Sequence, residues 1–189
     1  MAKPRVFEKP LGMRDLLPET VLYKRQLEHS IQQCLRRWGY EEIVTPTLEY
    51  YDTIGEASLI EEDKLFKLLD RGGNTLVLRP DMTAPIARVI SSILRNEPLP
   101  LRLSYHGNVF RAQEKEAGRH AEFFQSGVEL IGDGSAEADA EIVALAVDCL
   151  RQAGVKDFRI ALGSMAYVDR LFAEVISNKE DEDQLKQYL

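Results

Sequence analysis

The sequence predicts a mixed fold of helices and strands, and three observations support this. Segments whose apolar residues recur every three to four positions alternate along the chain with short runs of strand character. Clusters of Gly, Asn and Asp separate neighbouring runs and favour hairpins. With 189 residues, 44% of them hydrophobic, the chain can bury a real core, most simply as one domain.

The first expected element is a helix over 17–38. Its apolar residues fall on one face at 3.6-residue spacing: Leu27, Ile31, Cys34, Leu35 and Trp38. Pro18 suits the first turn and Gly39 suits the position after the last. A short strand is expected over 43–45, and Pro46 should place it at a sheet edge or a bend, because proline cannot donate to a strand ladder.

Hairpins and helices follow in the rest of the chain. Strands over 65–69 and 75–78 flank the turn Asp70–Asn74, which predicts a hairpin. Further strands are expected at 101–106, 109–112, 122–131 and 158–162, and further helices at 84–96, 135–154 and 165–176. Ser135 is a plausible N-cap. The charged segment before residue 122 should be the tip of a second, antiparallel hairpin.

Composition narrows the class of protein. The net charge of −7 argues against a strong, sequence-independent grip on nucleic acid. No apolar run approaches the roughly 20 residues of a membrane span, and the first ten residues lack the apolar core of a secretory signal. Cys34 and Cys149 lie on apolar helix faces without a metal-binding pattern, so we expect buried free thiols. These features predict a soluble cytoplasmic protein.

The C-terminal residues allow two interpretations. The segments 179–183 and 184–189 are too polar to bury much, and no Gly or Pro ends the helical pattern. One interpretation is a solvated helix end. The other, which we favour, is that the chain is a segment of a longer protein.

Two clusters of polar residues could form a site. Asp81 and Thr83 lie between a predicted strand and a helix, where they could bind a ligand or cap the helix. Gln125 and Glu129 share one strand face with Gly127, and Arg111 lies on the paired strand. A carboxylate suits a ligand ammonium and an arginine can grip a carboxylate. The pattern fits a polar amino-acid site, or a strand whose polar face meets water.

Several motifs resemble class II histidyl-tRNA synthetases, in order from about residue 10 to 155. The motifs are the opening Gly12–Pro18, the motif 1-like Gly39–Pro46, the histidine-loop-like Leu78–Ala84, and the motif 2-like pieces Tyr105–Phe110, Arg111, Gly118–Arg119 and Glu122–Gly132. The resemblance implies an α+β fold: a mostly antiparallel sheet flanked by helices, incomplete at the C-terminus. Residues 1–189 would then be the N-terminal part of a class II synthetase-like core domain.

The resemblance also implies roles for individual residues. Asp81, Thr83, Gln125 and Glu129 fall where the synthetases contact histidine. Arg111 falls on the motif 2 arginine, which contacts the substrate carboxylate and the ATP α-phosphate. Gln113 and Arg119 fall on positions of the nucleotide loop.

The departures from the synthetase pattern concern the nucleotide side. Gln113 stands where synthetases carry Glu, Ala121 replaces a loop arginine, and Asp81-Met82 stands where they have Glu-Gly. Met82 adds a side chain where backbone could otherwise approach the ligand. Motif 3 and the anticodon-binding domain are not among these residues. Because amino-acid activation relies on fixed cations against the phosphates, the pattern is typical of a sensor.

The segment Asp81–Arg88 resembles the regulatory subunits of ATP phosphoribosyltransferase, a family of synthetase paralogues, more closely than it resembles a synthetase. The resemblance implies a subunit without catalytic residues, cofactor or metal, which assembles with a short-form catalytic subunit. It further implies L-histidine as feedback effector, a dimer through the motif 1-like segment, and no tRNA or membrane partner. Two alternatives remain open, a truncated histidyl-tRNA synthetase and a dimerisation scaffold with a vestigial pocket.

Overall fold

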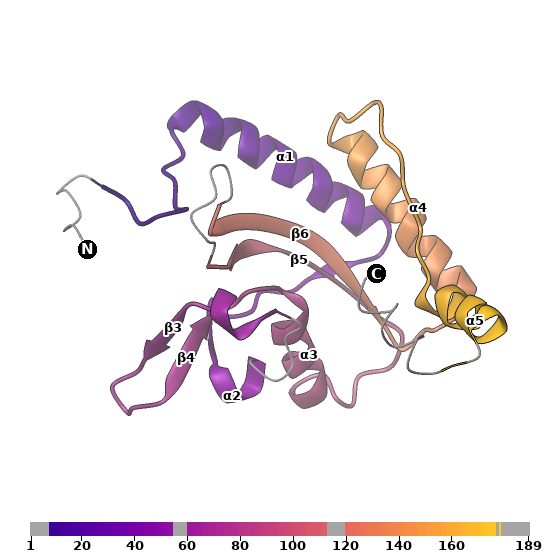
Figure 1. The fold of residues 1–189 in the computed structure, drawn as a ribbon. Helices are drawn as coiled ribbons and strands as arrows, with labels where there is room; N and C mark the ends of the chain where they lie inside the picture. The colour runs from indigo at the N-terminus through magenta and orange to yellow at the C-terminus, as the bar shows by residue number, and fades with distance from the viewer. Residues whose placement is uncertain (1–7, 55–59, 113–119, 177, 179–189) are drawn as a thin grey trace. The chain divides into compact units, whose positions relative to one another are not determined.

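The structure is a computed structural model that describes residues 8–54, 60–112, 120–176 and 178. The chain divides into two compact units, Met1–Val155 and Lys156–Leu189. The described part of the first unit contains two three-stranded sheets, with strand orders β1-β5-β6 and β2-β4-β3 (Figure 1). Three of the four strand pairings are antiparallel and one, between β1 and β5, is parallel. The expected α+β fold with a mostly antiparallel sheet is confirmed.

The central layer is a long hairpin of β5 (Leu101–Phe110) and β6 (Glu122–Ile131), which pair along their whole length. The short strand β1 (Glu41–Glu42) lies parallel to β5 at the edge. The register sets Tyr105 opposite Gly127. Since directly opposite residues point to the same side of an antiparallel pair, the odd-numbered residues of both strands form one face. We call it the front face, and the even-numbered residues form the back face.

Helices α1 (Pro18–Arg37) and α4 (Ala136–Gln152) cover the back face (Figure 1). The core on this side consists of Cys34, Leu35, Tyr40 and Leu145, with Val128 and Leu130 of β6 packed against it. Polar contacts at its rim join α4 to the residues around the end of α1. The Trp38 indole donates to Asp148 at 2.9 Å, and the Tyr40 hydroxyl donates to Glu141 at 2.8 Å.

Helix α3 (Thr83–Ser92) lies on the front side of the hairpin (Figure 1). The core there contains Met82, Ile86, Leu103 and Val109. The second sheet, made of β2 (Leu48–Tyr50), β3 (Lys67–Leu69) and β4 (Thr75–Leu78), lies nearby with the short helix α2 (Tyr51–Ile54) and the 3₁₀ turn η1 (Glu62–Lys64). A third core cluster of Ile54, Leu65, Val77 and Ala84 fills this part.

Several sequence predictions are confirmed. Helix α1 and strand β6 match their expected ranges within one residue, and the β3–β4 hairpin forms. Ser135 caps α4, since its hydroxyl accepts from the Ala138 amide at 3.2 Å. Cys34 and Cys149 are free thiols, the first buried and the second partly buried.

The strand expected over 43–45 is displaced to Glu41–Glu42. The Ile43 amide still donates to the Ser104 carbonyl at 2.9 Å, but the following carbonyls are taken by the Arg79 side chain. The two expected strands 101–106 and 109–112 are one strand, because Gly107 and Asn108 stay paired with Gln125 and Phe124.

In the second unit, helix α5 (Met165–Val175) confirms the helix expected over 165–176. The strand expected over 158–162 is wrong: these residues form no strand, and Leu162 is 76% exposed. No partner strand for them occurs in the described part of the chain. The polar segment 179–189 lies outside the described residues. Among the helices that are described, none combines the length and the apolar character needed to cross a membrane.

Candidate functional site

On the front face, a hydrogen bond joins the first residue of α3 to a residue of β6. The Thr83 hydroxyl donates to Glu129 Oε1 at 2.8 Å. Glu129 is partly buried, and burial raises the pKa of its carboxyl. The Thr83 hydrogen bond opposes this rise, while the nearby charge of Asp81 adds to it. Ionising the Glu129 carboxyl costs free energy in this surrounding, and a ligand cation beside it would favour the charged form.

Asp81 has a structural task as well. Its Oδ1 accepts from the Ala84 amide at 2.9 Å, in the first turn of α3. The helix-capping interpretation is therefore confirmed for Asp81, whereas the Thr83 hydroxyl turns to Glu129 instead. The Asp81 charge still reaches the site, because it raises the pKa of both Glu129 and Tyr105.

Tyr105 is a member of this group that the sequence analysis missed. Its ring lies against Gly127 on the opposite strand, where a Cβ atom would fall 2.6 Å from Tyr105 Cζ. Glycine at this position lets the ring lie close to the sheet. Burial raises the pKa of Tyr105, and the charges of Glu129 and Asp81 raise it further. The strand register, which puts Tyr105 opposite Gly127, is the signal that would have found it.

Gln125 lies on the front face opposite Gly107, as the alternation along β6 predicted. Its side chain makes no hydrogen bond to any residue in the described ranges. A Cβ atom at Gly107 would meet the Arg79 guanidinium at 2.5 Å. Arg79 is only 6% exposed and donates to the carbonyls of Asn108 and Thr45, both at 2.8 Å. It holds the β5 strand to the 45–47 segment beneath the site.

Arg111 lies just beyond the end of β5. Its Nε donates to the Pro80 carbonyl at 2.9 Å, and its guanidinium carbon lies 5.3 Å from the centre of the Phe123 ring. Within the residues that are described, Pro80 is the one hydrogen-bond acceptor of this guanidinium. This hydrogen bond orients the guanidinium, and the N–H groups of its Nη atoms remain to bind an anion.

Two departures from the synthetase pattern have a structural explanation. Ala121 is 2% exposed, and its amide donates to the Gly12 carbonyl at 2.9 Å. A Cβ atom at Gly12 would fall 2.6 Å from the Ala121 Cβ, so a larger side chain at position 121 would displace the N-terminal segment. Met82 is 2% exposed in the front core. The expectation that its side chain stands toward the ligand is wrong, because the apolar core buries it.

We call Asp81, Thr83, Tyr105, Arg111, Gln125 and Glu129 the front-face site. The Asp81 carboxylate, the Thr83 hydroxyl and the Tyr105 phenol gather around Glu129, and Arg111 lies toward the far end of the hairpin. Opposite charges at its two ends suit a zwitterion. Gln113 and Arg119 lie outside the described residues. In the described ranges, no three His, Cys, Asp or Glu side chains gather as a metal site would require.

Comparison with known proteins gives consistent results. The family model described as histidyl-tRNA synthetase matches residues 12–189. The ATP phosphoribosyltransferase regulatory subunit of Halalkalibacterium halodurans is 52% identical over 189 residues, which is 100% of this chain and 48% of that protein. The subunit of the same name from Bacillus subtilis is 55% identical over 184 residues, covering 97% of this chain and 47% of that protein. The chain thus spans about half the length of these curated relatives.

Solved structures show the same relationship. A crystal structure named ATP phosphoribosyltransferase regulatory subunit/histidyl-tRNA synthetase, from Bacillus halodurans, has a TM-score of 0.91 at 51% identity and covers 98% of this chain and 48% of that chain. A histidine–tRNA ligase subunit from Alicyclobacillus acidocaldarius has a TM-score of 0.77 at 28% identity, with 97% and 53% covered. The chain therefore belongs to the histidyl-tRNA synthetase family, and the relatives that are 52% and 55% identical to it are named ATP phosphoribosyltransferase regulatory subunits.

Proposed function

We propose that this chain is the N-terminal part of a non-catalytic regulatory subunit of ATP phosphoribosyltransferase, which supports the first step of histidine biosynthesis. The front-face site binds L-histidine, the end product, as a feedback inhibitor. The names of the relatives support the regulatory role. The chemistry of the site supports an amino-acid effector.

The observation that carries the proposal is the group around Glu129. Its carboxyl is partly buried, accepts from Thr83 at 2.8 Å and lies near a second carboxylate, Asp81. An α-ammonium group placed here would relieve the unfavourable charge and gain charge-assisted hydrogen bonds. Arg111 can take the α-carboxylate, and Gln125 can donate to or accept from an imidazole. To shift the complex between two states, histidine needs a coupling of roughly 1–3 kcal/mol.

The residues at the nucleotide-binding positions of the synthetase pattern support a regulatory role and not a catalytic one. Activation of an amino acid with ATP depends on cations held against the phosphates. At position 121 the chain has a buried alanine packed on Gly12, in a place where the synthetase pattern has an arginine. The amino-acid side of the site thus keeps its charged groups while the phosphate side has lost one.

Calorimetric titration with L-histidine tests the effector. The wild-type chain should bind saturably, and Glu129→Gln should weaken binding about 30-fold, the size expected for a charged hydrogen bond of about 2 kcal/mol. Glu97→Gln, at an exposed position after α3, is the matched control and should bind as the wild type does. Equal affinity of Glu129→Gln and wild type would exclude this site.

Two further measurements separate the alternatives. The regulatory role predicts co-purification with a short-form ATP phosphoribosyltransferase catalytic subunit, and activation of that subunit. A truncated synthetase would instead catalyse histidine-dependent ATP–pyrophosphate exchange. A dimerisation scaffold with a vestigial pocket would do neither and would not bind histidine.

We also propose that the chain forms dimers through the motif 1-like segment Gly39–Pro46, acts in the cytoplasm and binds no tRNA. Large apolar side chains are exposed on and beside this segment, among them Val44 at 81% and Tyr50 at 54%. Such exposure favours an interface. Sedimentation should show a dimer that Val44→Asp converts to a monomer, and a wild-type monomer at all concentrations would contradict the dimer.

A further inference from the structure

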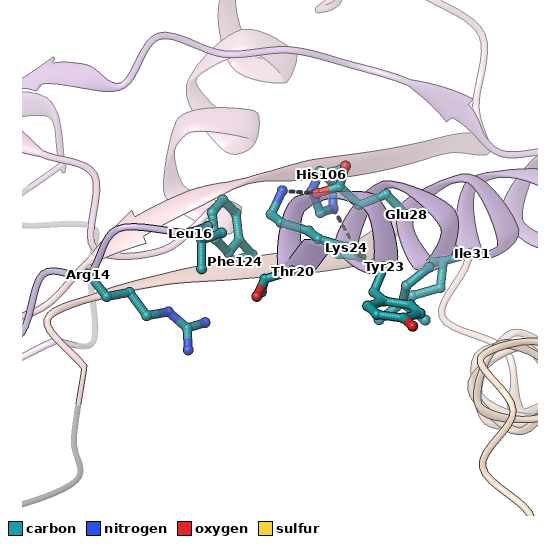
Figure 2. Close-up of a pocket in the computed structure, with 11 residues that line it drawn as sticks. Arg14, Leu16, Thr20, Tyr23, Lys24, Glu28, Ile31, His106 and Phe124 are labelled. Atoms are coloured by element: carbon teal, nitrogen blue, oxygen red, sulfur yellow. Dashed lines mark hydrogen bonds and ion pairs between the residues drawn. The ribbon is translucent and has the colours of Figure 1, made fainter. Parts of the chain in front are cut away.

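A cavity of about 500 Å³ lies on the back face of the hairpin, outside the front-face site. It is open to solvent and is lined by the segment before α1, by α1 itself and by the even-numbered residues His106, Phe124 and Ser126 (Figure 2). Small-molecule sites in proteins range over roughly 300–1,000 Å³ and combine apolar walls with a few convergent polar groups. This cavity has both features.

The inner wall is a hydrogen-bonded cluster around Glu28, whose side chain is 14% exposed. Its carboxylate accepts from Lys24 and from Arg25 Nη1, the latter at 2.9 Å. His106 Nε2 lies 2.7 Å from it, and His106 Nδ1 lies 2.6 Å from Ser126 Oγ. Both contacts are satisfied by a neutral imidazole that donates from Nε2 to Glu28 and accepts from Ser126 at Nδ1.

The charges of this wall do not cancel. Burial lowers the pKa of His106, and the neighbouring cations Lys24 and Arg25 lower it further, which favours the neutral ring. The Glu28 carboxylate therefore has two cationic partners, Lys24 in the cavity lining and Arg25 outside it, and Arg14 is a second cation of the lining. The cavity is a positive region on a chain whose net charge is −7, which favours an anion.

The apolar wall of the cavity includes the Phe124 ring, one face of which lies beneath the Lys24 ammonium. The Phe124 ring is stacked parallel to His106, with 6.3 Å between the ring centres and 3° between the planes. Lys24 Nζ lies 3.7 Å from the centre of the Phe124 ring. Figure 2 shows Arg14 at one end of the lining and Tyr23 at the other, with Thr20 between them.

We propose that this cavity is a second ligand site, which binds a small planar anion: an aromatic ring that carries one acidic group. The ring packs against the lining leucine side chains Leu16 and Leu27 and against the edge of Phe124. The anionic group pairs with the Arg14 guanidinium, within the field of Lys24. This proposal is independent of the proposed function, because none of these residues belongs to the front-face site.

The test uses phenyl phosphate as the probe and the 189-residue chain labelled for NMR. Saturable shifts are expected at Thr20, His106, Phe124 and Ser126. Benzyl alcohol, which lacks the charge, and inorganic phosphate, which lacks the ring, should each bind at least 10-fold more weakly. A phenyl phosphate affinity matched by either partial probe would overturn the planar-anion assignment.

Variants locate the interaction. Arg14→Gln should weaken phenyl phosphate binding about 5- to 10-fold through loss of a charge-assisted hydrogen bond, while Arg71→Gln, at an exposed turn between β3 and β4, should leave it unchanged. Thr20→Trp fills the opening from an exposed position and should abolish binding. Unchanged affinity in Arg14→Gln and Thr20→Trp would overturn the site, as would shifts confined to the separate apolar groove of about 380 Å³ beside Val128 and Cys149. Absence of saturation up to about 10 mM probe would overturn it as well.

Discussion

The two faces of the β5–β6 hairpin take alternate residues of the same two strands but differ in composition and in the elements that pack on them. The front face carries both glycines of the two strands, Gly107 and Gly127. Because they have no side chain, Arg79 lies close to the sheet at Gly107 and Tyr105 does so at Gly127. The back face has no glycine and is covered by α1 and α4. The alternation of side chains along the strands thus separates the face that carries the front-face site from the face on which α1 and α4 pack.

The same division governs the carboxyl groups. On the back side, Glu141 accepts two hydrogen bonds from Arg102, at 2.9 and 2.8 Å, and one from Tyr40. Arg102 and Tyr40 lower the pKa of Glu141 to about 2. On the front face, burial and Asp81 raise the pKa of Glu129. The Glu141 carboxyl accepts three hydrogen bonds from its protein partners, whereas among the described residues the Glu129 carboxyl accepts one, from Thr83.

The largest expected effect compares the packed core of the back face with a polar residue of the front-face site. Leu145→Ala removes a side chain that is 2% exposed in the α1–α4 core, and should lower the free energy of unfolding by about 2–5 kcal/mol. Gln125→Ala on the front face should change it by less than about 0.5 kcal/mol. Urea unfolding followed by circular dichroism measures both. Similar losses in the two variants would break the division.

The second prediction concerns pH, and the two faces should respond with opposite signs. The pKa of Glu141 is depressed in the folded state, so its contribution to stability is present above pH 4.5, its ordinary pKa, and is lost as pH falls toward about 2. The pKa of Glu129 is raised, so the folded state takes up its proton first and stability from this group rises as pH falls toward 4.5.

Unfolding free energies of wild type, Glu141→Gln and Glu129→Gln between pH 2.5 and 7 check these signs. The free energy of unfolding of Glu141→Gln should fall less steeply than that of the wild type as the pH falls below 4.5. Glu129→Gln should remove a destabilising contribution near neutral pH. The same direction of change in both variants would show that the two faces do not differ in this way.

Features that depend on residues close together in the chain could be predicted from the sequence. The alternation along 122–131 placed Gln125 and Glu129 on one face, and Ser135 was recognised as a cap, because both depend on residues a few positions apart. Tyr105 was missed because its place depends on the strand register that sets it opposite Gly127. Arg79 lies within a motif that predicts a ligand loop, yet its acceptor Thr45 is 34 positions earlier in the chain, so its structural task could not be read locally.

Two errors have a common origin in tertiary packing. The run 158–162 alternates as a strand does, but a strand also requires a neighbour, and the described residues provide none. Met82 follows Asp81 in a loop that resembles a ligand site, but its apolar side chain enters the front core. Local pattern gives the residue types of a site, whereas packing decides which of them face the ligand.

The smallest expected effect is the most specific to the front face. Thr83→Val removes the hydroxyl that donates to Glu129 at 2.8 Å and opposes the rise of its pKa. The pKa of Glu129 should therefore rise further, while stability changes by about 1 kcal/mol or less. Thr83→Ser keeps the hydroxyl and should leave the titration near that of the wild type. The carboxyl carbon shift of Glu129, followed by NMR against pH, measures the difference. If Thr83→Val leaves the titration unchanged, burial and Asp81 alone set the charge of Glu129, and the link between α3 and the hairpin has no part in preparing the site for a cation.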